Sequence, residues 1–331
     1  MDKCQLPLEI LELIVQNVLP PGTSVVLPAS DIATRTLCSC LRLCKATLPL
    51  SQRLLYQSSL YIEYPWRLKA LLRSYEPSSA ETTRWSLQYT CKLRASTSLY
   101  LSPFHSDVII DLGTIDDIDR LFRLLSETLQ RLVIDMPLRS MDPDEPSGQL
   151  VMPKVRRAFE QLQVLTEFVS VRDELYTNMM TEGERSEHWR ERSEVWARWQ
   201  KLERLALFNC NLEIPMWKND LCSLPFLKTL VLSMSDSMEE LDDLLRKLGE
   251  QVTVKVIETE GRNRSFLRDE PALSSRYTSA WGESFKTTGS SSNEDEAALK
   301  LVCLDDSDGP YSTDNCQNWV KDTALGGTLF S

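Results

Sequence analysis

A leucine pattern that occurs four times between residues 129 and 232 limits the possible folds more than any other feature of the chain. Each copy follows the frame L-x-x-L-x-L, with conservative or polar replacements at three positions. The framed residues are Leu129, Leu132 and Ile134; Leu165, Phe168 and Ser170; Leu202, Leu205 and Leu207; and Leu227, Leu230 and Leu232. Their first positions lie 36, 37 and 25 residues apart. Such a recurrence predicts stacked strand units whose framed side chains share one continuous core, while the residues between them line an exposed strand face.

The segments between and before the frames alternate in the same way between strand and helix patterns. Residues 59–64 and 98–104 are rich in β-prone side chains, whereas residues 66–75, 115–129 and 238–250 have helical periodicity. The pattern predicts an α+β / α/β fold whose middle part is an irregular leucine-rich-repeat-like α/β solenoid. The alternative is an ordinary α/β domain with leucine-rich strands.

The first 58 residues have a different pattern, which predicts three short helices. Pro7 begins an amphipathic helix that ends before Pro20, Asp31 caps a second helix, and Pro49 begins a third. A unit of about fifty residues buries too little apolar surface to be stably folded by itself, so it needs a partner surface.

The N-terminal segment resembles an F-box of the form found in fungal F-box proteins. The resemblance lies in "LPLEILELI" and, some thirty residues later, "LRLCKATLPLSQRLLY", and it covers roughly residues 5–58. It implies docking on a Skp-type adaptor that tethers the protein to a cullin-based ubiquitin ligase. By match to the motif, the adaptor contacts would be Leu6, Pro7, Ile10, Leu43, Cys44 and Lys45. The alternative is a purely structural amphipathic helix.

Two stretches of the middle segment are similar to fungal F-box proteins with divergent leucine-rich repeats. They are "EFVSVRDELY" and "WQKLERLALFNC". The implied role of the repeats is to capture a protein target on the strand positions between the framed residues. The candidate target contacts are Glu203, Arg204, Ala206, Phe208, Lys228, Thr229 and Val231.

The C-terminal segment changes in composition from about Gly261 onward, where Ser, Thr, Gly and acidic residues dominate. Low-complexity stretches of this kind predict a mostly disordered acidic tail over 261–331, with residues 298–304 as a candidate short strand or docking peptide. The predicted organisation is therefore an F-box-like helical segment (1–58), a divergent leucine-rich-repeat-like domain (59–260) and the tail.

Charge and composition exclude several classes of function. The chain has 37 basic and 48 acidic side chains and a net charge of −11, which argues against binding nucleic acid or an anionic membrane. No signal peptide or membrane-spanning run is expected, and nine scattered cysteines are expected to be reduced. These features predict a cytoplasmic and/or nuclear protein.

The sequence also lacks the common signatures of enzymes. The two histidines, His105 and His188, have no partners at metal-ligand spacing, and nucleotide-binding loops and nucleophile elbows are absent. Cys38, Cys40 and Cys44 are expected to pack rather than to bind metal. Trp189, Trp196 and Trp199 are expected to pack rather than to bind a ligand.

We therefore expect a non-enzymatic substrate receptor of an SCF-type ubiquitin ligase that needs no cofactor. Its expected partners are a Skp-type adaptor, a cullin reached through that adaptor, and an unknown protein target. The alternatives are an adaptor-independent repeat scaffold, in which the helical segment caps the repeats, and an enzyme of unfamiliar type with a deep polar pocket.

Overall fold

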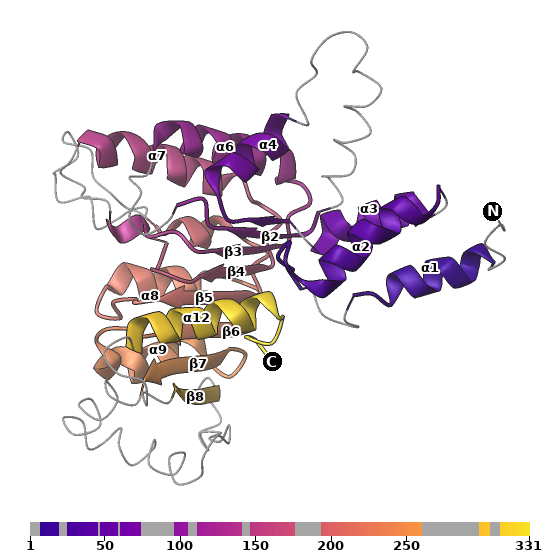
Figure 1. Ribbon diagram of the computed structural model, residues 1–331. Helices are drawn as coiled ribbons and strands as arrows, with labels where there is room; N and C mark the ends of the chain where they lie inside the picture. Colours follow the sequence, from indigo (N-terminus) through magenta and orange to yellow (C-terminus); the bar gives the residue numbers. More distant parts are fainter. Residues whose placement is uncertain are drawn as a thin grey trace.

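The computed structural model describes ten parts of the chain, and the statements below concern only these. They are residues 7–19, 25–45, 47–58, 60–73, 96–104, 111–140, 146–175, 193–259, 298–304 and 312–331. Within them the protein is a mixed α/β structure built on one parallel sheet, with three N-terminal helices projecting from it (Figure 1).

The sheet has eight strands, and their order across the sheet is their order along the chain. They are β1 (Tyr61–Ile62), β2 (Ser98–Leu101), β3 (Arg131–Ile134), β4 (Glu167–Ser170), β5 (Arg204–Phe208), β6 (Thr229–Ser233), β7 (Thr253–Thr259) and β8 (Ala298–Leu304). Each pairs in parallel with its neighbours. Parallel strands cannot be joined by hairpins, so each connection crosses over outside the sheet.

The four leucine frames coincide with β3, β4, β5 and β6, and they lie in register. Leu132 is opposite Phe168, Phe168 is opposite Leu205, and Leu205 is opposite Leu230. Every framed residue is at most 5% exposed. The prediction that the framed side chains share one core is therefore confirmed.

Helices and turns of the crossovers cover one face of the sheet, which we call the α4–α9 face. They are α4 (Pro65–Arg73), α6 (Leu112–Leu125), α7 (Pro146–Glu160), the 3₁₀ turn η4 (Val195–Arg198), α8 (Pro215–Cys222) and α9 (Leu241–Leu248). Their apolar side chains and the framed residues form a single cluster. Gly249, with φ +70°, ends α9 in a left-handed conformation that other residues rarely adopt.

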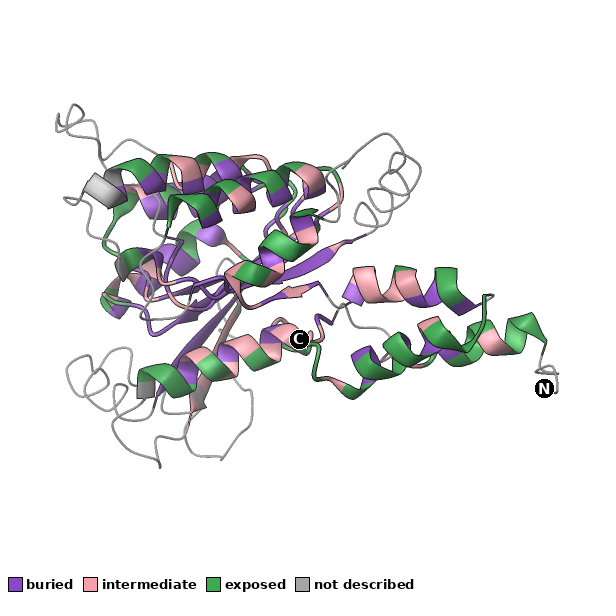
Figure 2. Cartoon of the chain, turned by 45° about the horizontal axis from the view of Figure 1, so that its top comes forward, coloured by how far each residue is buried: buried purple, intermediate pink, exposed green. Residues whose placement is uncertain are grey.

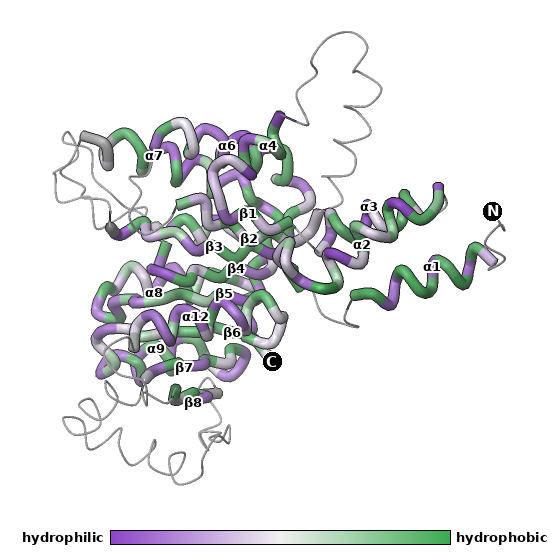
Figure 3. The backbone as a smooth tube through the Cα atoms, in the orientation of Figure 1, coloured by the Kyte–Doolittle hydropathy of each residue, from purple (hydrophilic) through white to green (hydrophobic). Residues whose placement is uncertain are grey.

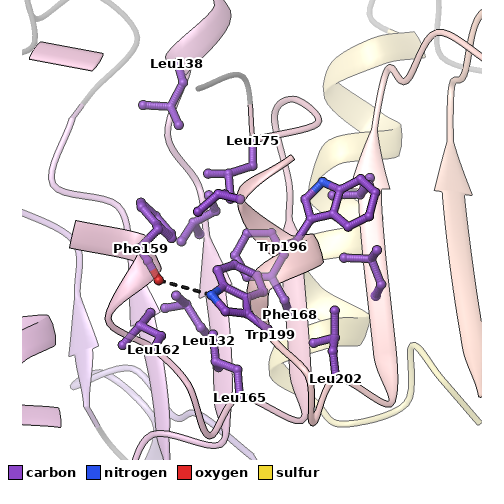
Figure 4. Packing of buried hydrophobic residues seen from close by; sticks show 14 of the residues in the cluster. Leu132, Leu138, Phe159, Leu162, Leu165, Phe168, Leu175, Trp196, Trp199 and Leu202 are labelled. Atoms are coloured by element: carbon purple, nitrogen blue, oxygen red, sulfur yellow. Dashed lines mark hydrogen bonds between the residues drawn. The ribbon is translucent and has the colours of Figure 1, made fainter. Parts of the chain in front are cut away.

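Aromatic side chains fill the centre of this cluster (Figure 4). Phe159 of α7 contacts Phe122 of α6 edge to face, with ring centroids 5.0 Å apart, and Trp199 contacts Phe168 of β4 at 4.9 Å. The indole Nε1 of Trp199 donates to the backbone oxygen of Phe159 at 3.1 Å. Trp196 and Trp199 are fully buried, which confirms their predicted packing role; Trp189 lies outside the described residues.

The opposite face of the sheet, which we call the α12 face, is covered by the C-terminal helix α12 (Ser312–Leu325) (Figure 1). Cys316, Val320 and Ala324 of the helix belong to the same buried cluster as strand residues of this face. The candidate short strand at residues 298–304 is confirmed as β8, whereas the prediction of a mostly disordered tail is wrong for residues 312–331, which contain α12. Its remaining residues from 261 onward lie outside the described residues.

The N-terminal segment contains the three predicted helices, α1 (Leu8–Gln16), α2 (Ile32–Leu43) and α3 (Thr47–Ser58). The Asp31 carboxylate accepts from the backbone N–H of Ala33 at 2.7 Å, so the predicted cap of the second helix is confirmed. The third helix begins two residues before Pro49. A small cluster of Val15, Leu37, Cys40 and Leu50 holds the three helices together.

Candidate interaction surfaces

The first candidate surface is the outer side of α1. Only Val15 of this helix is buried, while Leu8, Ile10, Leu13 and Ile14 are between 43% and 55% exposed. Figure 3 shows α1 as mostly hydrophobic with hydrophilic residues between the apolar ones, and Figure 2 shows that most of it is exposed. Ile10, Leu13 and Ile14 are three or four residues apart and share one side of the helix, and exposed apolar residues grouped in this way are a candidate interaction surface.

The predicted adaptor contacts lie at the end of the helical segment that is distant from the sheet. Pro7 and Ile10 are exposed near the start of α1, and Leu43 is 68% exposed at the end of α2. Cys44 and Lys45 are exposed in the turn that follows. Both views place the start of α1 and the α2–α3 turn toward the same far end (Figures 1 and 2). Leu6 lies outside the described residues.

Sequence reasoning missed other exposed apolar residues in the same segment. Ile32 is 80% exposed at the start of α2, and Leu48 is 37% exposed at the start of α3. The α2–α3 turn is held by the hydroxyl of Thr47, which donates to the backbone oxygen of Cys40 at 2.8 Å. Cys40 is buried as predicted, whereas Cys38 and Cys44 are exposed, so the packing prediction is wrong for these two thiols.

The second candidate surface is the α12 face, where the target contacts were predicted. Ala206, Phe208 and Val231 do belong to this face, but α12 covers them and they are at most 3% exposed. The prediction that the residues between the framed positions are open to solvent is therefore wrong for these three. No local pattern in the strands signals this, because the covering helix comes from more than eighty residues further along the chain.

The other predicted target contacts lie at the N-terminal ends of β5 and β6 and remain partly or fully exposed. Lys228 is exposed, and Glu203, Arg204 and Thr229 are half-buried. The ammonium of Lys228 is 2.9 Å from a carboxylate oxygen of Glu203. These side chains form a charged rim beside α12.

Charged side chains cross the α12 face in one row of the sheet. Arg131, Glu167 and Arg204 occupy matching positions on β3, β4 and β5. The Glu167 carboxylate accepts from Nε of both arginines, at 2.7 Å for Arg204. Arg131 and Glu167 are buried, so their charges are compensated by each other rather than by water.

A second polar group lies near the other end of α12. The Asp135 carboxylate accepts from Arg172 Nε at 2.5 Å and from the Tyr100 hydroxyl at 2.9 Å. Lys321 of α12 lies 3.6 Å from the same carboxylate. Burial, together with the negative charge of Asp135, raises the pKa of Tyr100 well above its usual value, so the phenol remains a hydrogen-bond donor.

The third candidate surface is a cleft of about 360 Å³ between the helical segment and the first strand. Its lining is mostly apolar and comes from α2, α3, β1 and α4. The lining residues are Ala29, Thr34, Leu41, Gln52, Leu55, Tyr56, Leu60, Tyr61, Ile62, Arg67 and Leu71. It lacks the converging acid, base and nucleophile groups that an active site requires.

Metal binding and membrane insertion find no support in the part of the chain that the structure describes. It contains no group of three or more His, Cys, Asp and Glu side chains arranged to hold a metal ion. None of its helices has the length and hydropathy needed to cross a bilayer. His105 and His188 are not among the described residues.

Comparison with known proteins leaves the chain without an assigned family. No family model matches the sequence, and the curated proteins contain no match to it. The case for a function therefore depends on the surfaces described above.

Proposed function

We propose that the protein is a non-enzymatic substrate receptor of a cullin-based ubiquitin ligase, with α1–α3 acting as an F-box that docks on a Skp-type adaptor. The observation that carries the proposal is the outward apolar side of α1. Four large aliphatic side chains of a nine-residue helix remain exposed although the helix is anchored through Val15. A partner that covers them would bury apolar surface at about 25 cal/mol per Å².

The position of the helical segment supports the same function. It projects from the sheet, so a second protein can cover its far end at a distance from the sheet (Figure 1). In this proposal the sheet and its crossovers form a divergent leucine-rich-repeat solenoid that holds a protein target. Ubiquitin transfer is then accelerated by proximity, without chemistry or a cofactor in this chain. Such a receptor would act in the cytoplasm and/or the nucleus.

The test is co-purification of the full chain with a Skp-type adaptor. Ile10→Asp is expected to reduce adaptor binding at least tenfold, because it places a charge in the surface to be covered. The variant Leu6→Ala, Pro7→Ala, Ile10→Ala should also lose binding. Glu12→Gln, an exposed polar change on the same helix, is the matched control and should bind normally.

Two results would contradict the proposal. One is a folded wild-type chain that does not bind the adaptor at micromolar concentration. The other is binding that Ile10→Asp leaves unchanged. If the adaptor does bind, mass spectrometry of the proteins that co-purify with the wild-type chain searches for the target in the same preparation.

The cleft beside β1 favours a second candidate function. Leu55 and Tyr56 of α3 lie next to Tyr61 and Ile62 of β1, which is the place where a terminal cap of a repeat array would sit. The protein would then be an adaptor-independent scaffold for protein interactions. In that case Ile10→Asp would leave partner binding unchanged.

A further inference from the structure

Helix α12 contacts the sheet through a stripe of small, buried apolar residues, beside which Trp319 and Leu325 are partly buried against the same cluster. Cys316, Val320 and Ala324 are four residues apart, so they lie on one side of the helix, and each is at most 1% exposed. Beneath them the α12 face carries one apolar side chain from each of four adjacent strands. The paired residues are Val133, Val169, Ala206 and Val231. Small side chains on both sides allow a helix to lie close to the sheet.

Polar contacts hold the C-terminal part of this segment. Arg131 donates from Nη2 to the backbone oxygen of Ala324, and Lys255 donates to the backbone oxygen of Leu329 at 3.2 Å and to that of Ser331. The last carbonyl groups of a helix have no partner within the helix and carry partial negative charge, which cations stabilise. Arg131 therefore receives a carbonyl group of the last turn of α12, and Lys255 receives backbone oxygens of the segment that follows the helix.

Polar side chains also hold the middle of α12. Arg172 donates to Gln317 at 3.3 Å, and Lys321 is 3.6 Å from Asp135. The combination of an apolar centre with polar contacts at its margins is the composition of a protein–protein interface rather than of a domain core.

The chain connectivity makes α12 separable from the sheet. All paired strands contact one another without it, and its described outer side, which includes Asp314, Asn318 and Asp322, is exposed. Outside the sheet, its end is also contacted by the backbone N–H of Val26, which donates to Leu325 at 3.2 Å. Undocking α12 would therefore break no strand pairing.

We propose that α12 is an internal ligand that undocks while the sheet stays folded, and that the uncovered row of Val133, Val169, Ala206 and Val231 binds a helix of the target protein. The fitting helix has small apolar residues four apart and ends where Arg131 receives one of its last carbonyl groups. That this helix belongs to a ubiquitylation target rests on the proposed function. That the α12 face binds a helix does not rest on it.

The test uses the full chain and a fluorescent peptide of residues 312–331. Val320→Asp places a charge in the centre of the buried stripe and should undock α12, whereas Asn318→Asp makes the same charge change on the exposed side and is the matched control. The peptide is expected to bind the Val320→Asp chain at least tenfold more tightly than the wild-type or Asn318→Asp chain, because a tethered helix competes at millimolar effective concentration. A peptide that itself carries Val320→Asp should not bind.

Hydrogen exchange of the wild-type chain provides a measurement that does not depend on any variant. Amides of α12 are expected to exchange at least tenfold faster than those of β4 and β5, through local opening. The proposal is overturned if both exchange only in global unfolding, if Val320→Asp unfolds the sheet, or if the folded variant fails to bind the wild-type peptide. None of these measurements involves the adaptor, so they fail or succeed independently of the receptor proposal.

Discussion

The two faces of the sheet are both buried, but they are buried in different ways. The α4–α9 face carries the framed aliphatic and aromatic residues and is covered by segments that lie between consecutive strands. The α12 face carries Arg131, Glu167 and Lys255 among its apolar residues and is covered mainly by one helix from the end of the chain. The first has the character of a core and the second that of an interface, although solvent exposure alone does not separate them.

The largest expected effect is the loss of the carboxylate that joins the two arginines on the α12 face. Glu167→Ala leaves Arg131 buried without its acidic partner, which we expect to destabilise the fold by about 3–5 kcal/mol. Urea denaturation measures this loss. Replacing the half-buried Glu203, which pairs with the exposed Lys228, is the matched control and should change stability by less than about 1 kcal/mol.

The next effect compares leucine truncations on the two faces. Leu230→Ala on the α4–α9 face should cost about 2–5 kcal/mol of global stability, because Leu230 is fully buried in the core. Leu329→Ala removes an almost equally buried leucine from the α12 side. It should cost less, about 2 kcal/mol or below, and should mainly speed hydrogen exchange in α12. Equal losses in urea denaturation would show that the two faces form one cooperative core.

A smaller effect is a pH dependence of stability that comes from Glu174. This buried acid pairs with one arginine, whereas Glu167 pairs with two. Glu174, after β4, pairs with Arg139 at 2.5 Å, but burial prevails and raises its pKa from 4.5 to about 7. The folded state therefore holds the proton more tightly than the unfolded state. The free energy of unfolding should fall as pH rises from about 4.5 to about 7, by up to about 3 kcal/mol from this group.

Glu174→Gln removes this titration and should flatten the pH dependence of stability between these values. Urea denaturation of both proteins at pH 5 and pH 8 measures the change. If the difference between the two pH values is the same in the variant, Glu174 is not the group responsible.

The smallest expected effect on stability is on α1. Leu13→Ala should change the free energy of unfolding by less than about 0.5 kcal/mol, because Leu13 is 55% exposed. Val15→Ala, on the buried side of the same helix, should cost more. If Leu13→Ala destabilises the isolated chain strongly, the outer side of α1 is not a free surface.

Much of the sheet could be predicted from the sequence because its signal is local. The framed leucines repeat along the chain, and their alternation already determines which side chains share a face. The Asp31 cap and the amphipathic character of α1 also come from neighbouring residues. The target contacts could not be predicted in the same way, since Ala206, Phe208 and Val231 follow the correct alternation but meet a helix that begins at residue 312.

By itself, then, the sequence determined strands β1–β6, the core residues of β3–β6 and the three N-terminal helices, all of which depend on short-range periodicity and capping. Only the tertiary structure decided that the other face of the sheet is closed and that Arg131 and Lys255 bind backbone oxygens of α12 and of the residues after it. The physical reason is that α12 docks mainly through small side chains and backbone oxygens. The composition of this segment gives little indication of such contacts, because they depend on which sheet residues lie beneath the helix.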